Sequence, residues 1–209
     1  MKRKFMVFTA LFTLLSSLFF FKSPEVKAKR IVVSVQTIAD EEWRERYGKD
    51  WKSRVWYMVE NADEAFYDEF KIDFSPDYCV AWDLDDSITD LSDLLAAADS
   101  DVADKGDFKM VFSSQLSSGD AGVTTYAGAD EMIVRDTQNQ SYDWDTTRHE
   151  ASHGYYCSHR GHSDTTTDCI LNQNSSVWDT NCWDTINSHK KKLQRNNHAT
   201  KVFDLCSSK

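Results

Sequence analysis

The segment His149-Glu150-Ala151-Ser152-His153 constrains this 209-residue sequence more than any other. Residues four apart on a helix lie on the same face, one turn above the other, so the imidazoles of His149 and His153 can bind a single metal ion. Glu150 follows the first histidine and can reach a water on that ion without being a ligand itself. The segment therefore predicts a helix that carries a metal site with a general base beside it.

A third ligand is expected from the chain that follows. On a continuous helix, His159 would lie about 9 Å beyond His153 along the axis, whereas each ligand of a zinc ion lies about 2 Å from it. The helix must therefore end soon after His153. Gly154 could end it, or Tyr156 could take the turn, and either would bring His159 back to the first two histidines.

The sequence leaves alternatives to His159 open. No glutamate follows Glu150, so a downstream glutamate cannot be the third ligand, and a histidine or an aspartate remains. His162 is the histidine alternative, although it needs a longer excursion of the chain. Asp164 or Asp168 is the aspartate alternative.

The N-terminal residues have the pattern of an export signal. Basic residues at positions 2–4 precede an apolar run over 5–21, and Val26-Lys27-Ala28 offers small residues where a signal peptidase cleaves. We expect a signal peptide over 1–28 and a single domain over 29–209 that is secreted and not stably associated with a membrane. A retained N-terminal anchor is the alternative, although the apolar run is shorter than the roughly 20 residues that span a bilayer.

The charge of the chain argues against some partners. The chain has 24 basic and 34 acidic residues, and the expected signal peptide contains five of the basic and one of the acidic ones, so the remainder has a formal charge of −14. An acidic surface disfavours nucleic acid and anionic membranes as partners. We expect a monomeric protein.

Hydrophobic periodicity predicts alternating strands and helices. A β-branched run at 31–35 predicts a strand, and an apolar stripe from Trp51 to Phe70 predicts a long helix that starts at a capping Asp50. Further along the chain we expect one or two strands over 72–82 with a turn at 75–77, a helix over 89–98, strands at 108–112 and 132–134, a glycine-flanked sheet-edge segment over 119–128, and a cap at 145–147 for the histidine-bearing helix.

Two groups of residues carry weaker expectations. Asp83, Asp85 and Asp86 could hold calcium, but their spacing is not that of a calcium loop, and a solvated turn is the expected structure. The five cysteines, at positions 79, 157, 169, 182 and 206, are compatible with two disulfides and one remaining thiol in an exported chain, and their pairing cannot be read from the sequence.

The order of these parts resembles the metzincin clan of zinc endopeptidases, most closely its adamalysin-type and archaemetzincin-type members. The sharp motif match covers residues 148–172. The resemblance implies an α+β fold: a twisted mixed sheet, a long backing helix, an active-site helix and a small irregular C-terminal subdomain. It also implies that His149, His153 and His159 bind zinc, that Glu150 is the general base, and that an extended substrate lies along an edge strand containing Val123, Thr124, Thr125 and Tyr126.

Two positions depart from the metzincin pattern. Tyr156 stands where the pattern has the glycine at which the chain turns back, and a left-handed residue with a side chain costs about 1 kcal/mol or more. Leu171, in the segment Cys169-Ile170-Leu171-Asn172, replaces the methionine of the turn beneath the metal. This second exchange nearly conserves volume, so we expect it to be tolerated.

The resemblance implies a secreted zinc endopeptidase that hydrolyses protein or peptide substrates with a zinc-activated water, from which Glu150 accepts the proton. The alternative is an inactive metal-binding or interaction protein on the same scaffold. The departures at Tyr156 and Leu171 favour the alternative. The intact Glu150 favours the enzyme, since a structural ion needs no base beside its ligands.

Overall fold

The computed structural model describes residues 29–116, 118–159, 169–171 and 177–194. Its elements in chain order are β1 (Ile31–Ala39), α1 (Glu41–Tyr47), a 3₁₀ turn η1 (Gly48–Asp50), α2 (Trp51–Phe70), β2 (Ile72–Ala81), α3 (Leu91–Asp101), β3 (Phe108–Ser113), β4 (Gly122–Thr124), β5 (Glu131–Arg135), α4 (Gln140–Gly154) and α5 (Thr180–His189). The expected signal peptide over 1–28 lies outside the described residues.

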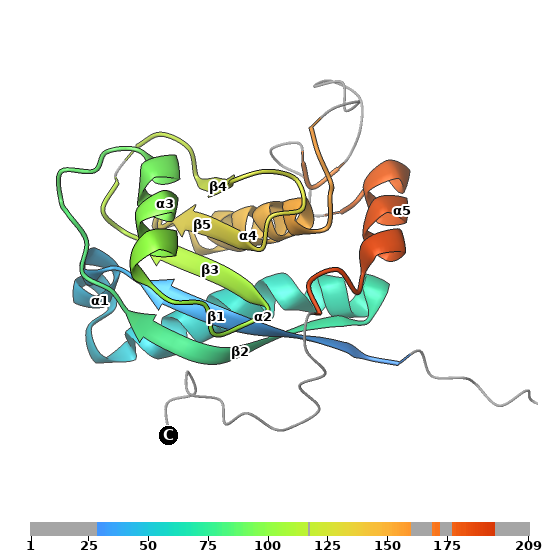
Figure 1. Cartoon of the computed structure of the whole chain (residues 1–209), viewed down its shortest axis with the longest axis horizontal. Coiled ribbons are helices and arrows are strands. Elements are labelled where there is room, and N and C mark those ends of the chain that lie inside the picture. The colour runs from blue at the N-terminus through green and yellow to red at the C-terminus, as the bar shows by residue number, and fades with distance from the viewer. Residues whose placement is uncertain (1–28, 117, 160–168, 172–176, 195–209) are drawn as a thin grey trace, which may run out of the picture.

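The strands form a five-stranded mixed sheet in the order β2-β1-β3-β5-β4. The β1, β2, β3 and β5 strands are parallel to one another, whereas β4 runs antiparallel to β5 and forms one edge. Figure 1 shows α3 on one side of the sheet and the helices α2 and α4 on the other. The α+β prediction of a mixed sheet with a long backing helix is therefore confirmed.

The alternation of side chains along the strands divides the core into two layers. Met110 and Phe112 of β3 face the α2 and α4 side, and Val111 between them faces α3. In β5, Met132 and Val134 likewise face the α2 and α4 side, and Ile133 faces α3. Because parallel strands are buried on both faces, they read as continuous apolar runs in the sequence.

The segment 72–82, expected to form one or two strands, contains the single strand β2 over Ile72–Ala81. The predicted turn at 75–77 is wrong, because Pro76 lies inside β2 and pairs with Val35 of β1. The register shifts directly after this pair, and Asp77 is the extra residue. Within the described sheet β2 is an edge strand, where the missing N–H of proline and a bulge are both tolerated.

The helix that carries the histidines begins earlier than expected. Its N-cap is Asn139, whose side-chain oxygen accepts a hydrogen bond from the N–H of Tyr142, so the predicted cap at 145–147 is wrong. Thr147 lies within the helix instead, where its hydroxyl donates to the carbonyl of Asp143 at 2.8 Å. This local bond lets a threonine that resembles a cap residue lie inside a helix.

Smaller differences concern other caps and the acidic turn. Asp50 occupies the N-cap of α2, but its side chain makes no capping bond, because the 3₁₀ turn leads directly into the helix. Asp83 pairs with Arg44, and Asp85 accepts a hydrogen bond from the N–H of Ser87, as expected of a solvated turn. None of the described helices is long and apolar enough to cross a membrane.

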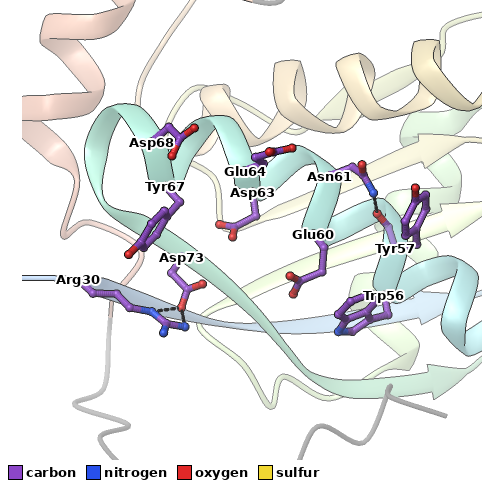
Figure 2. Close-up of a pocket in the computed structure, with 10 residues that line it drawn as sticks. All are labelled: Arg30, Trp56, Tyr57, Glu60, Asn61, Asp63, Glu64, Tyr67, Asp68 and Asp73. Carbon is purple, nitrogen blue, oxygen red and sulfur yellow. Dashed lines mark hydrogen bonds and ion pairs between the residues drawn. The ribbon is translucent and has the colours of Figure 1, made fainter. Parts of the chain in front are cut away.

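A hollow of about 460 Å³ lies between α2 and the start of β2 (Figure 2). Among its lining residues, Asp63 is only 6% exposed and accepts a hydrogen bond from the N–H of Phe74 at 2.7 Å. Burial raises the pKa of Asp63 to about 7, although that hydrogen bond acts in the opposite direction. Four other carboxylates are among the described residues that line the hollow, and no histidine or cysteine is among them.

We predict that Asp63→Asn stabilises the protein at pH 8. Asp63 takes up its proton near pH 7 in the folded protein and near pH 3.8 when unfolded, so between these values the folded state binds more protons. The free energy of unfolding therefore falls as pH rises through this window. At pH 8 the variant avoids the cost of a buried carboxylate, and we expect a gain of more than about 1 kcal/mol in urea unfolding. An equal gain at pH 5 and pH 8 would contradict this.

Candidate active site

Helix α4 places His149, Glu150 and His153 at its C-terminal end. The rings of His149 and His153 lie 4.9 Å apart between centroids, and their Nε2 atoms are 3.2 Å apart. The helix ends at Gly154, and Tyr156 then takes a left-handed backbone with φ of 70°. Gly154 is thus the last helical residue, and of the two residues that the sequence offered for the turn it is Tyr156 that takes it.

The turn returns the chain to the two helical histidines. The ring of His159 lies 5.1 Å from that of His149 and 4.9 Å from that of His153. Each of the three offers a ring nitrogen within 4.8 Å of the other two. The structure thus brings the three predicted ligands together, while the alternatives His162, Asp164 and Asp168 lie outside the described residues.

Two backbone carbonyls orient the helical imidazoles. Nδ1 of His149 donates to the carbonyl of Ile170 at 2.8 Å, and Nδ1 of His153 donates to the carbonyl of Cys157 at 2.7 Å. Both Nε2 atoms are then unprotonated and face each other without a hydrogen between them. Two ligands at 2.0–2.1 Å from a tetrahedral zinc ion lie about 3.3 Å apart. The donor set and the observed Nε2 separation of 3.2 Å therefore fit zinc.

The charge state of the histidines also suits a metal. Burial is the main cause that lowers the pKa of His149 to about 4, and the neighbouring His153 adds to this shift. Burial lowers the pKa of His153 as well. At neutral pH both rings are uncharged, which is the state in which imidazole binds a metal.

The ring of Tyr156 contacts three neighbours although the residue is 44% exposed. Its ring lies against Gly128, where an added Cβ would be 2.3 Å from the Tyr156 Cε1 atom. The ring also contacts His189 at 4.9 Å between centroids, and Lys192 Nζ lies 5.4 Å from its centroid. These contacts offset the cost of a positive φ at a residue with a side chain.

The segment beneath the histidines is buried. Ile170 and Leu171 are each 2% exposed, and Cys169 before them is fully buried. Leu171 therefore occupies a packed position, in line with the prediction that an apolar residue is tolerated there. Asn172, the last residue of the predicted motif, lies outside the described residues.

Glu150 lies beside the histidines and is 6% exposed. Its Oε1 atom is 3.9 Å from Nε2 of His149, and its Oε2 atom accepts a hydrogen bond from the hydroxyl of Thr124 at 2.8 Å. Burial raises the pKa of Glu150 to about 7, the Thr124 bond acts to lower it, and Asp120 adds to the rise. A carboxylate with a pKa near neutrality can both accept and return a proton at pH 7.

A cleft of about 1380 Å³ opens in front of these residues. Val123, Thr124 and Tyr126 line it, together with the three histidines and Glu150. Of the predicted edge segment, Val123 and Thr124 belong to β4, whereas Thr125 and Tyr126 follow the end of the strand. The paired edge strand is thus shorter than predicted, and Thr125 is not among the residues that line the cleft.

The cysteines near the site are thiols. Cys157, Cys169 and Cys182 are buried and free, and the Sγ atoms of Cys169 and Cys182 are 3.4 Å apart. Two disulfides would need four of the five cysteines. Because three of the five are free, at most one disulfide can form within the chain, and the expectation of two disulfides is wrong. Cys206 lies outside the described residues.

Sequence reasoning missed three partners of the site. The carbonyls of Ile170 and Cys157 leave no signal in the sequence, because any residue supplies a backbone carbonyl. Thr124 was assigned to substrate binding, yet its hydroxyl contacts Glu150. Its position two residues after Gly122 places both on one face of a strand, which is the only signal that the sequence offers.

Comparison with known proteins gives one family. Residues 29–198 match the metallo-peptidase family M12. No curated protein matches the sequence. Two solved structures are similar. One is archaemetzincin from Methanopyrus kandleri, with a TM-score of 0.54 and 12% identity over 81% of this chain and 98% of that one. The second is a chain from a structure of a chaperone-substrate complex, with a TM-score of 0.61 and 11% identity over 81% of this chain. The present chain spans 35% of the length of that second chain.

We predict that Gly128→Ala destabilises the protein more than Gly119→Ala. Both glycines have a positive φ, at 94° and 97°, so both exchanges strain the backbone by about 1 kcal/mol. Only the Cβ at position 128 meets the ring of Tyr156, whereas nothing lies within 4 Å of a Cβ at position 119. We expect a further loss of about 1–3 kcal/mol from overpacking, measured by chemical unfolding of both variants. Equal losses would show that the ring does not brace the turn.

Proposed function

The chain belongs to metallo-peptidase family M12, and from this premise we propose that it is a secreted zinc endopeptidase in which Glu150 is the general base. One observation carries the proposal. Three imidazoles converge beside a buried carboxylate at the floor of an open cleft, and backbone carbonyls orient two of these imidazoles. A surface cluster of histidines without a catalytic role needs neither the carboxylate nor the cleft.

His149, His153 and His159 would hold the zinc ion. A zinc ion held there polarises a peptide carbonyl and lowers the pKa of water towards neutrality. The three rings are the only protein groups that this assignment requires, which leaves the cleft side of the site for water and substrate.

Glu150 would move the proton. Its carboxylate faces the cleft beside His149, accepts a proton from the attacking water and delivers it to the leaving amine. Burial raises the pKa of Glu150 above that of an ordinary carboxyl group, which favours its holding the proton between the two steps.

The substrate would be an extended peptide that lies along β4. This strand pairs only with β5 among the described strands, so its other side has backbone groups available for pairing. Asp120 and Asp145 line the cleft together with Glu150, and no lysine or arginine is among the described lining residues. We therefore expect peptides with basic side chains to be cleaved in preference to acidic ones.

The remaining parts of the proposal rest on the sequence. Residues 1–28 would be a signal peptide, and the secreted domain over 29–209 would act as a monomer outside the cytoplasm. The formal charge of −10 of the whole chain argues against a nucleic acid partner.

The inactive alternative loses its main support. It was favoured by Tyr156 and Leu171, which depart from the metzincin pattern. Tyr156 takes the left-handed turn with its ring against Gly128, and Leu171 is buried, and these two observations support the enzyme over the inactive alternative. The alternative also gives no reason for a buried carboxylate next to His149.

We predict that Glu150→Gln keeps zinc and the fold but loses peptidase activity. Removal of a general base lowers kcat by about 10²–10⁴-fold. The assay is cleavage of unfolded casein by the purified protein, which a zinc chelator must abolish in the wild type. Near-normal turnover of the variant, with zinc content equal to that of the wild type, would refute the role of Glu150.

We predict that His159→Ala loses bound zinc, whereas His189→Phe, which keeps an aromatic ring against Tyr156, does not. Both residues follow α4 in sequence, but only His159 lies with the other two rings, since Nδ1 of His189 donates to the carbonyl of Thr185. Metal content after dialysis is the measurement, with His162→Ala as a third protein. If His162→Ala is empty and His159→Ala is loaded and active, the third ligand is His162.

A further inference from the structure

The edge strand β4 presents two residues to the general base. Gly122 and Thr124 are two apart, so their side-chain positions share one face of the strand, and Val123 between them packs into the layer beside α3. The shared face is turned towards α4, where both positions meet Glu150. The strand that would pair with substrate therefore also contacts the catalytic carboxylate directly.

The hydroxyl of Thr124 makes the polar part of this contact. It donates to Oε2 of Glu150 at 2.8 Å and lies 3.1 Å from the backbone carbonyl of the same residue. One carboxylate oxygen is thereby fixed on the strand side, while Oε1 remains on the side of His149. Hydrogen bonds to an ionised carboxylate are short and roughly twice as strong as neutral ones.

Gly122 makes the steric part of the contact. A Cβ at this position would lie 2.7 Å from Cγ of Glu150, 2.7 Å from Cγ2 of Thr146 and 2.9 Å from Oε1 of Glu150. The backbone of β4 at Gly122 therefore packs directly against the side chain of Glu150, and any side chain at position 122 would clash with it. Together with the Thr124 bond, this leaves the carboxylate one orientation between the strand and the helix.

We propose that Thr124 is a positioning residue for Glu150, with Gly122 providing the space for the carboxylate. The inference rests on the proposed function, in which Glu150 is the general base. It replaces the expectation that the Thr124 side chain binds substrate, while the backbone of β4 stays available for substrate. A general base has to lie within hydrogen-bond reach of the proton that it takes, so the loss of its orientation lowers turnover rather than substrate affinity.

The decisive variant is Thr124→Val, which keeps the shape of the side chain and removes the hydroxyl. In the zinc-loaded protein we expect kcat for a chelator-sensitive peptide substrate to fall by about tenfold or more, with KM within about twofold of the wild type and zinc content unchanged. Thr124→Ser should restore most of kcat, because it returns the hydroxyl. Thr185→Val is the matched control, since its hydroxyl bonds within α5 at the carbonyl of Asn181.

A second measurement does not depend on activity. The unfolding free energies of the zinc-loaded wild type, Thr124→Val, Glu150→Ala and the double variant form a cycle, and we expect the two exchanges to be non-additive because each removes one partner of the same hydrogen bond. In an active wild-type protein, additive energies, an unchanged kcat in Thr124→Val, or a raised KM with unchanged kcat would each overturn the role of Thr124 alone. A wild-type protein without chelator-sensitive hydrolysis would overturn the proposed function itself.

Discussion

The reversal of the chain after Gly154 is the constraint on which the rest of the site depends. His149 and His153 are brought together by any helix, but His159 reaches them only if the chain turns back within a few residues. The turn needs a left-handed residue, and here that residue is Tyr156. A side chain makes this conformation costly, so the cost has to be offset by the contacts of the ring with Gly128, His189 and Lys192. The turn is thus stabilised by tertiary packing rather than by local backbone preference.

That packing ties the active-site helix to the C-terminal part of the chain. His189 is the last residue of α5, and Lys192 follows it, so the brace of the turn comes from residues more than 30 positions later. The N–H of Gly128 in turn donates to the carbonyl of His153 at 2.7 Å. The loop after β4, the end of α4 and the end of α5 therefore form one contact region around the histidines. A glycine at position 156 would need less of this support.

The sequence was sufficient where a local pattern decides the structure. Apolar alternation and the stripe from Trp51 to Phe70 predict the strands and the long helix, because these residues pack in the core whatever their neighbours are. Prediction from the sequence failed where more than one residue, or more than one structure, was compatible with the local pattern. Thr147 resembles a helix cap, but Asn139 caps the helix and Thr147 bonds back to Asp143 within it. Pro76 is a residue typical of turns, but in the structure it lies within the edge strand β2.

The same distinction holds within the site. The spacing of the histidines is local and can be predicted, whereas the bond between Thr124 and Glu150 joins residues 26 apart and depends on where β4 ends against α4. At Leu171, by contrast, the sequence departs from the metzincin pattern while the contact made by His149 is kept. The contact that His149 makes with this segment is to the backbone carbonyl of Ile170, so the neighbouring side chain has only to fill a buried space. An apolar residue of similar volume meets that requirement, and the sequence can change at this position while the orientation of the imidazole is preserved.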